Sequence, residues 1–198
     1  MEESARQAVP SDLAVLSSLA VAARHELQDK KGGDVADRLD PHRDDPSARM
    51  AAALEDPGTV VLVGALDEAV VGYGLMVVGT APDGTGHAVV EEVYVDPPAR
   101  SVGVGEALLD GLLSAARERG ARAIQSVALP GDRATKNFFE THGMVARSIM
   151  VHRWLDDRGV SGDRNCASEP WPWTATTYCS FGEVPTPGRA SGLFPADG

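Results

Sequence analysis

The stretch of residues 90–109, VEEVYVDPPARSVGVGEALL, constrains the fold of this chain more than any other. It opens with a β-branched run that predicts a strand ending at Val95, and adjacent prolines then stop that strand. A loop with Arg100 and glycines follows, and a helix is predicted to open at Glu106. The first N–H groups of a helix lack intrahelical partners and lie at the positive end of its dipole. The pattern therefore predicts a site for a phosphorylated ligand, to which Arg100 adds a full positive charge.

The remaining pattern predicts an α/β (α+β) fold whose central sheet is mixed but mostly antiparallel. Strands are expected at 6–9, 59–66, 69–80, 87–95, 123–129 and 144–155, and helices at 12–28, 47–55, 106–119 and 132–141. A short turn separates 59–66 from 69–80, which predicts a hairpin, and Gly72 and Gly74 indicate a bulge or bend in its second strand. A helix leads from Val95 to the next strand, and such a connection produces parallel neighbours.

The length of 198 residues favours one domain with an extension. We expect the domain over 1–155, and a disordered C-terminal tail over 156–198, where glycine, proline and serine replace the regular pattern. Trp171 and Trp173 are the exception in this tail, and docking on the domain or on a partner is the alternative. The two cysteines, Cys166 and Cys179, predict neither a disulfide framework nor a metal site. No metal is predicted.

The formal net charge of −11 argues against a nucleic-acid partner and favours a cationic substrate. The acidic stretch 29–46 is expected to be a polar loop with one short helical turn, either a solvated surface or a wall that attracts an amine. No run approaches the roughly 20 apolar residues that a membrane helix needs, and the N-terminus does not have the composition of a signal peptide. The sequence thus predicts a cytoplasmic protein that does not bind membranes.

The order of these elements, together with R-x-x-G-x-G at Arg100, Gly103 and Gly105, resembles the GNAT superfamily of acyl-CoA N-acyltransferases. Two further segments support the resemblance: ALLDGLL after the loop, and NFFETHGM in place of the family's F-Y-x-x-x-G-F segment. The resemblance spans about residues 6–155. It implies the GNAT fold, with helices on both faces of a sheet that is splayed between the strand ending at Val95 and the strand 123–129.

By this resemblance, the backbone of 100–105 would bind the pyrophosphate of acetyl-CoA, and the strand up to Val95 would pair with the pantetheine arm. The residues implied to contact acetyl-CoA are Val93, Val95, Arg100, Ser101, Val102, Gly103, Val104, Gly105, Glu106, Asn137 and Phe139. The family often uses a tyrosine in the F-Y position to protonate the departing thiolate, and this chain has Phe138 and Phe139 there. Tyr94, a water molecule or direct release of the thiolate would have to serve instead.

Glu91 and Glu92 occupy the positions before Tyr94 where many such enzymes carry an acidic residue. Strand alternation places the two carboxylates on opposite faces, with Glu91 on the face of Val93 and Val95. We therefore favour Glu91 as the general base, directly or through water, and Glu92 as the residue of the opposite face or as a ligand of the substrate ammonium. The alternatives are that both are solvent-facing strand carboxylates, or that His25 or His87 is the base.

These features predict an N-acetyltransferase that transfers the acetyl group of acetyl-CoA to a primary amine of a small molecule or peptide in a ternary complex. The alternative is a non-catalytic sensor or regulatory module that binds acyl-CoA. A nucleotide-phosphate binder is disfavoured, because the loop lacks the Lys and Ser/Thr of a P-loop. A homodimer is compatible with the sequence.

Overall fold

A computed structural model describes residues 2–153 of the chain. The strands are β1 (Glu3–Gln7), β2 (Thr59–Leu66), β3 (Ala69–Thr80), β4 (Gly86–Val95) and β5 (Ala123–Ser126). The helices are α1 (Leu13–Gln28), α2 (Gly33–Leu39), α3 (Pro46–Glu55), α4 (Val104–Glu118) and α5 (Arg133–Thr141). The predicted tail 156–198, with Trp171 and Trp173, lies outside the described residues, so the domain boundary stays a prediction.

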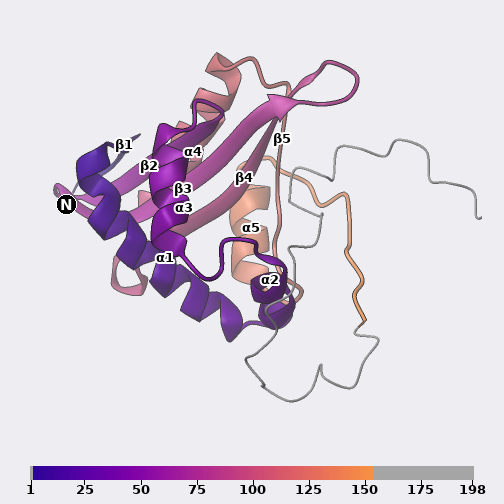
Figure 1. The fold of residues 1–198 in the computed structure, drawn as a ribbon, viewed down its shortest axis with the longest axis horizontal. Coiled ribbons are helices and arrows are strands. Elements are labelled where there is room, and N and C mark those ends of the chain that lie inside the picture. The colour runs from indigo at the N-terminus through magenta and orange to yellow at the C-terminus, as the bar shows by residue number, and fades with distance from the viewer. Residues whose placement is uncertain (1, 154–198) are drawn as a thin grey trace, which may run out of the picture.

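The sheet has the order β1-β2-β3-β4-β5, with antiparallel neighbours except for the parallel pair β4 and β5 (Figure 1). This confirms the α/β fold with a mixed, mostly antiparallel sheet. Pairing between β4 and β5 runs only from His87 opposite Ala123 to Val90 opposite Ser126. The last residues of β4, from Glu91 to Val95, continue without β5, as the predicted splay requires.

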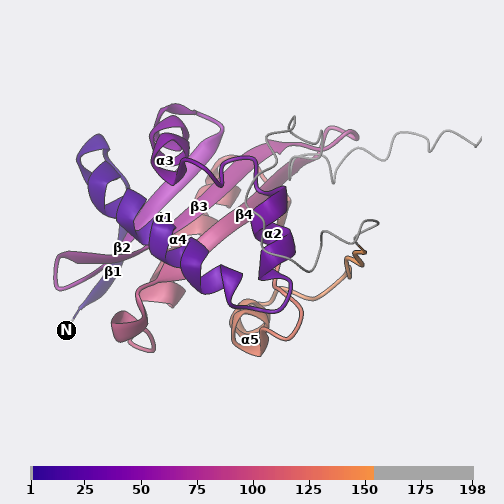
Figure 2. The ribbon, with the colours of Figure 1, turned by 60° about the horizontal axis from the view of Figure 1, so that its bottom comes forward.

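Helices cover both faces of the sheet, with α1 and α3 in front of it and α4 behind it in Figure 1. On the α4 face, Leu108 and Leu112 pack with Met76 and Val90 of the sheet. On the other face, the core is formed by residues of α1, α3 and the sheet: Leu16, Met50, Val63, Tyr73 and Leu75. Burying one such aliphatic side chain stabilises the fold by about 1.5–3 kcal/mol, so the two apolar layers fix the helices against the sheet. Figure 2 shows α1 and α3 together on one side of the sheet.

Two glycines let α4 approach the sheet closely. A Cβ atom added at Gly64 would lie 2.7 Å from Cγ1 of Val104, and one at Gly74 would lie 2.9 Å from Cδ1 of Leu112. The predicted irregularity near Gly72 is present, because the β2–β3 register shifts there and leaves Val71 without an opposite residue. Gly74 itself serves helix packing rather than a bend.

The predicted strand 144–155 is wrong for the residues that are described, because 144–153 contain no strand. The side chains of Ile149 and Val151 are 90% exposed there, so their apolar alternation finds neither a ladder partner nor a core face. Smaller differences concern boundaries. The strand predicted at 123–129 ends at Ser126, and the helix predicted at Glu106 begins at Val104, directly after the positive φ of Gly103. The acidic loop contains a full short helix, α2.

Candidate active site

The loop between β4 and α4 ends in a helix N-terminus that no side chain caps. Gly103, the N-cap residue, has a φ of 93° and no side-chain hydrogen bond, whereas Asp45 and Asp132 cap α3 and α5 with their carboxylates. Ser101 also has a positive φ, 65°, which is uncommon for a residue other than glycine and indicates a tightly determined loop. The first N–H groups of α4 are therefore left for an anion, as the sequence predicts.

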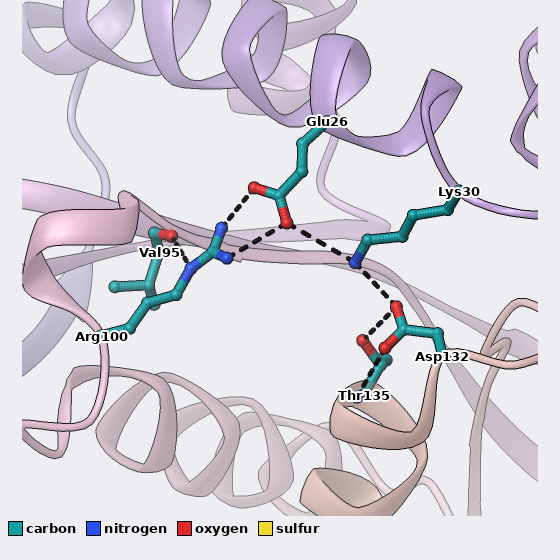
Figure 3. Close-up of polar contacts among 6 residues, drawn as sticks. All are labelled: Glu26, Lys30, Val95, Arg100, Asp132 and Thr135. Carbon is teal, nitrogen blue, oxygen red and sulfur yellow. Dashed lines mark hydrogen bonds and ion pairs between the residues drawn. The ribbon is translucent and has the colours of Figure 1, made fainter.

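Arg100 lies beside this loop but points back toward α1 (Figure 3). Its Nε donates to the backbone oxygen of Val95 at 2.8 Å, and its two terminal nitrogens donate to the Glu26 carboxylate at 3.1 and 2.5 Å. The guanidinium also lies 5.5 Å from the centre of the Tyr94 ring. The hydrogen bonds from Arg100 lower the pKa of Glu26 and in turn raise the pKa of Arg100.

The same network continues from α1 to α5. Lys30 lies 3.5 Å from the Glu26 carboxylate and 2.7 Å from the carboxylate of Asp132. Asp132 in turn accepts from the backbone N–H of Thr135 at 3.1 Å and from its hydroxyl at 2.8 Å. We call the group of Glu26, Arg100, Lys30 and Asp132 the open network, because it connects the α4 loop, α1 and α5 at the surface (Figure 3). Sequence reasoning missed the roles of Glu26 and Lys30, whose only signal is a helical i,i+4 spacing.

A β-bulge in β4 changes the expected placement of the two glutamates. Glu92 lies opposite Leu75 while Val90 lies opposite Met76, so Glu91 is the extra residue of the bulge. A bulge interrupts the period of two, and the predicted placement on opposite faces is therefore wrong. Both carboxylates reach one guanidinium, that of Arg49 on α3. Glu91 does not share the face of Val93 and Val95, which pack toward α4.

Arg49 joins the two glutamates into a cluster that we call the enclosed network, together with Tyr73. Nη2 of Arg49 donates to Oε2 of Glu91 at 2.8 Å, and Nη1 of Arg49 donates to Oε1 of Glu92. The hydroxyl of Tyr73 donates to Oε2 of Glu92. Both oxygens of Glu92 are thus used, whereas within residues 2–153 no hydrogen bond is made to Oε1 of Glu91. Arg49 and Tyr73 belong to no sequence motif, and the sequence analysis did not predict their place in the site.

Burial governs the electrostatics of the enclosed network. The Arg49 side chain is only 16% exposed, and burial acts to lower its pKa, but the charges of Glu92 and Glu91 outweigh this and leave the pKa raised. Tyr73 is fully buried, and burial followed by the nearby Glu92 charge holds its pKa well above the ordinary value of 10.0. Arg49 therefore stays charged and Tyr73 stays a hydrogen-bond donor at neutral pH.

Tyr94 lies between the two networks. Its ring is 6.3 Å from that of Tyr73 in the enclosed network, and it packs under Arg100 in the open one. Burial, followed by the charge of Glu26, raises the pKa of Tyr94 above 10.0. The phenol is therefore protonated at neutral pH, in the state that a proton donor needs.

The other residues implied by the resemblance surround the start of α4. Val95, Val102 and Val104 pack into the α4 core, whereas Ser101, Glu106 and Asn137 are exposed. Phe139 is buried, and the ring of Phe138 instead lies toward Gly105, 3.5 Å from where a Cβ atom would be. Their contacts with acetyl-CoA stay predictions.

The alternative bases, His87 and His25, have no hydrogen bond or ion pair with Glu91 or Glu92 within the described residues. His87 is in the paired part of β4, between Gly79 and Ala123, and its Nε2 is buried without a hydrogen-bond partner. His25 belongs to the last turn of α1. Within residues 2–153, no group of three or more His, Cys, Asp or Glu side chains could hold a metal ion. No helix in that range has the length and apolar character needed to cross a membrane.

Solved structures with the same fold include several acetyltransferases. An aminoglycoside acetyltransferase from an uncultured soil metagenomic sample is 17% identical, with a TM-score of 0.58, and the match covers 78% of this chain and 95% of that one. A ribosomal-protein-alanine N-acetyltransferase from Brucella melitensis biovar Abortus 2308 is 19% identical, with a TM-score of 0.58 over 77% and 99% of the two chains. A transcriptional regulator from Bacillus halodurans C-125 is 23% identical, with a TM-score of 0.57 over 77% and 100%.

No curated protein sequence matches this chain. The sequence profile of the acetyltransferase (GNAT) family, however, matches residues 15–144, which include most of α1, both networks and all of α5. That family catalyses acyl transfer and generally uses acetyl-CoA as its co-substrate. Because the match extends over more than half of the sequence, the chain belongs to the acetyltransferase (GNAT) family.

Proposed function

We propose that this chain transfers the acetyl group of acetyl-CoA to a primary amine by direct attack, with Glu91 as the general base. One observation carries the proposal. The bulge that presents Glu91 begins at the residue where β4 loses its pairing with β5, directly after Val90. The free edge of β4 and an oriented carboxylate with one unused oxygen thus occur at the same place along the strand.

The reaction requires a neutral amine, and an alkylammonium with a pKa near 10 must first lose a proton. Glu91 accepts that proton, directly or through water. The amine nitrogen then bonds to the carbonyl carbon of the thioester, the bond from carbon to sulfur breaks, and CoA leaves as a thiolate while the new amide nitrogen gives up its remaining extra proton to water. A thiol pKa of about 8.5 makes unassisted departure feasible. Tyr94, which is protonated, is the side chain of this site that can return a proton to the sulfur.

The start of α4 is the proposed site of the acyl donor. Its uncapped N–H groups and the conformation of Gly103 fit a diphosphate, which has no hydrogen-bond donors of its own when ionised. The unpaired edge from Glu91 to Val95 offers backbone groups to the amide-containing pantetheine arm. Arg49 and Arg100 are cations beside this edge, and both are already paired with carboxylates.

A cationic acceptor is the substrate class that we propose. The enclosed network has two carboxylates for one guanidinium, and the charge of Asp40, from the acidic segment between α2 and α3, also acts on Arg49. This local excess of negative charge attracts a positively charged amine. The net charge of −11 acts in the same direction. A cytoplasmic location and a homodimer stay predictions.

The test is release of free CoA thiol over time, with acetyl-CoA and a panel of polyamines, aminoglycosides and peptides. We expect thiol release that depends on one class of amine in the panel. Binding of acetyl-CoA with no amine-dependent release from any member would contradict the proposal.

That negative outcome would instead support a second candidate, an acyl-CoA-binding sensor. The observation that favours it is the phenylalanine pair, because neither Phe138 nor Phe139 can protonate the leaving thiolate. One of the similar structures is a transcriptional regulator, although the likeness extends only to the fold.

A further inference from the structure

The carboxylate of Glu26 lies where two cations converge. Both terminal nitrogens of Arg100 donate to it, at 3.1 and 2.5 Å, and Nζ of Lys30 lies 3.5 Å away on the other side (Figure 3). The cations come from different parts of the chain, the β4–α4 loop and the turn between α1 and α2. An oxyanion held by a guanidinium and an ammonium is the arrangement in which proteins commonly bind a phosphate group.

Both cations are held in place by contacts other than the one with Glu26. Nε of Arg100 donates to the backbone oxygen of Val95, and its guanidinium stacks on Tyr94. Lys30 is bound by Asp132, which is itself fixed as the cap of α5. If the Glu26 carboxylate rotated away, the two cations would therefore keep anchors of their own. Within the described part of the chain, the Glu26 carboxylate has no hydrogen-bond or ion-pair partner other than Arg100 and Lys30.

The contact between Glu26 and Arg100 is also accessible to a competitor. The Arg100 side chain is 41% exposed and the Glu26 side chain 31%, and ion pairs with this degree of exposure are weak in water. Arg100 directly precedes the loop that leads to the uncapped start of α4. A diphosphate that approaches those N–H groups carries more negative charge than the single carboxylate, so it competes well for the same guanidinium.

We propose that Glu26 occupies, in the free protein, an anion site formed by Arg100 and Lys30, and that the diphosphate of the acyl donor displaces it. This inference rests on the proposed function, because it takes the acyl donor to be a CoA thioester. It assigns Lys30 as a further residue that binds the donor and Glu26 as an internal competitor. Removal of the Glu26 charge leaves two cations against Asp132 alone, which favours a dianionic group.

The experiment measures CoA binding by calorimetry at low salt for the wild-type protein and for Glu26→Gln, Lys30→Gln and Glu140→Gln. Glu140→Gln is the matched control, because Glu140 forms an exposed i,i+4 pair with Lys136 and its substitution changes the net charge equally. Pantetheine, which has no phosphate, is the second ligand. We expect Glu26→Gln to bind CoA roughly three to ten times more tightly than Glu140→Gln does. Lys30→Gln should bind CoA more weakly than wild type, and the affinity for pantetheine should not change.

Two results would overturn the inference while leaving the proposed function intact. The first is CoA binding by Glu26→Gln that is no tighter than binding by Glu140→Gln, since Glu26 would then position Arg100 rather than compete for it. The second is a gain of equal size for pantetheine, since the competition would then not concern phosphate. Absence of CoA binding to every variant, with native circular dichroism, would contradict the proposed function as well.

Discussion

Two arginine–carboxylate networks contact β4, on either side of Tyr94, and they differ in exposure. In the enclosed network, the Arg49 side chain is 16% exposed and holds Glu91 and Glu92. In the open network, the Arg100 side chain is 41% exposed and holds Glu26. The chemical groups are the same, but ion pairs gain strength and lose exchangeability as water is excluded. Under the proposed function, this difference lets the enclosed network orient Glu91 as the base, while the open network exchanges its anion for a ligand.

The substitution with the largest expected effect removes the proposed base. Glu91→Gln should lower kcat/KM by about 10²–10⁴, because the amide keeps the shape of the side chain but cannot accept the ammonium proton. Glu92→Gln should affect the rate less, since Arg49 and Tyr73 already use both oxygens of Glu92. Steady-state thiol release with the best amine of the panel measures both. Equal rate losses would remove the distinction between the two glutamates.

The next effect concerns stability and compares the two arginines directly. Arg49→Met should lower the free energy of unfolding by about 2–3 kcal/mol, because it leaves two neighbouring carboxylates without their cation. Arg100→Met should lower it by less than about 1 kcal/mol, since its exposed partner can be solvated. Urea denaturation at neutral pH gives both values. If the two losses were the same, burial would not be what separates the networks.

A smaller effect is expected in the loop beside the open network. Gly103→Ala should cost about 1–2 kcal/mol of stability, because alanine is strained at a φ of 93°. Gly105→Ala is the control and should cost less than about 0.5 kcal/mol, since the nearest atom to its Cβ would be a Phe138 ring carbon at 3.5 Å. Thermal unfolding of both variants shows whether the backbone sets the loop. If Gly103→Ala did not lower the stability, the contacts of Arg100 rather than the backbone of Gly103 would determine the loop conformation.

The smallest effect is the pH dependence of the open network. Arg100 lowers the pKa of Glu26, so the unfolded chain binds this proton more readily than the folded one. The resulting stability is present above the unfolded pKa of about 4.3 and is lost as the pH falls through the folded value. The free energy of unfolding of wild type should therefore exceed that of Glu26→Gln by less than about 1 kcal/mol at neutral pH. This difference in stability should vanish in acid. A difference in stability that grew toward low pH would contradict the lowered pKa of Glu26.

Local signals predicted much of this fold. The β-branched runs, the turn between 66 and 69 and the helix after Gly103 gave the order of elements up to α5, because each depends on residues close in sequence. Alternation alone also predicted a strand at 144–155, but a strand needs a partner edge, and Ile149 and Val151 have none among the described residues.

The site was less predictable for two physical reasons. The bulge at Glu91 adds one residue without changing the local composition, so the period of two assigned this carboxylate to the wrong face. Arg49 and Glu26 reach their partners across 42 and 74 residues of sequence, through the packing of α1 and α3 on the sheet. No local pattern encodes such contacts, and only the assembled fold brings the charges together.

The central claim is that Glu91 takes the proton of the attacking amine, and the pH dependence of a single turnover tests it most directly. Acetyl-CoA is bound first, amine is then added, and thiol release is followed across a range of pH for wild type and Glu91→Gln. We predict equal acetyl-CoA affinity, slower release by the variant and the loss of one ionisation from its pH–rate profile. The same profile and the same rate in both proteins would contradict the claim.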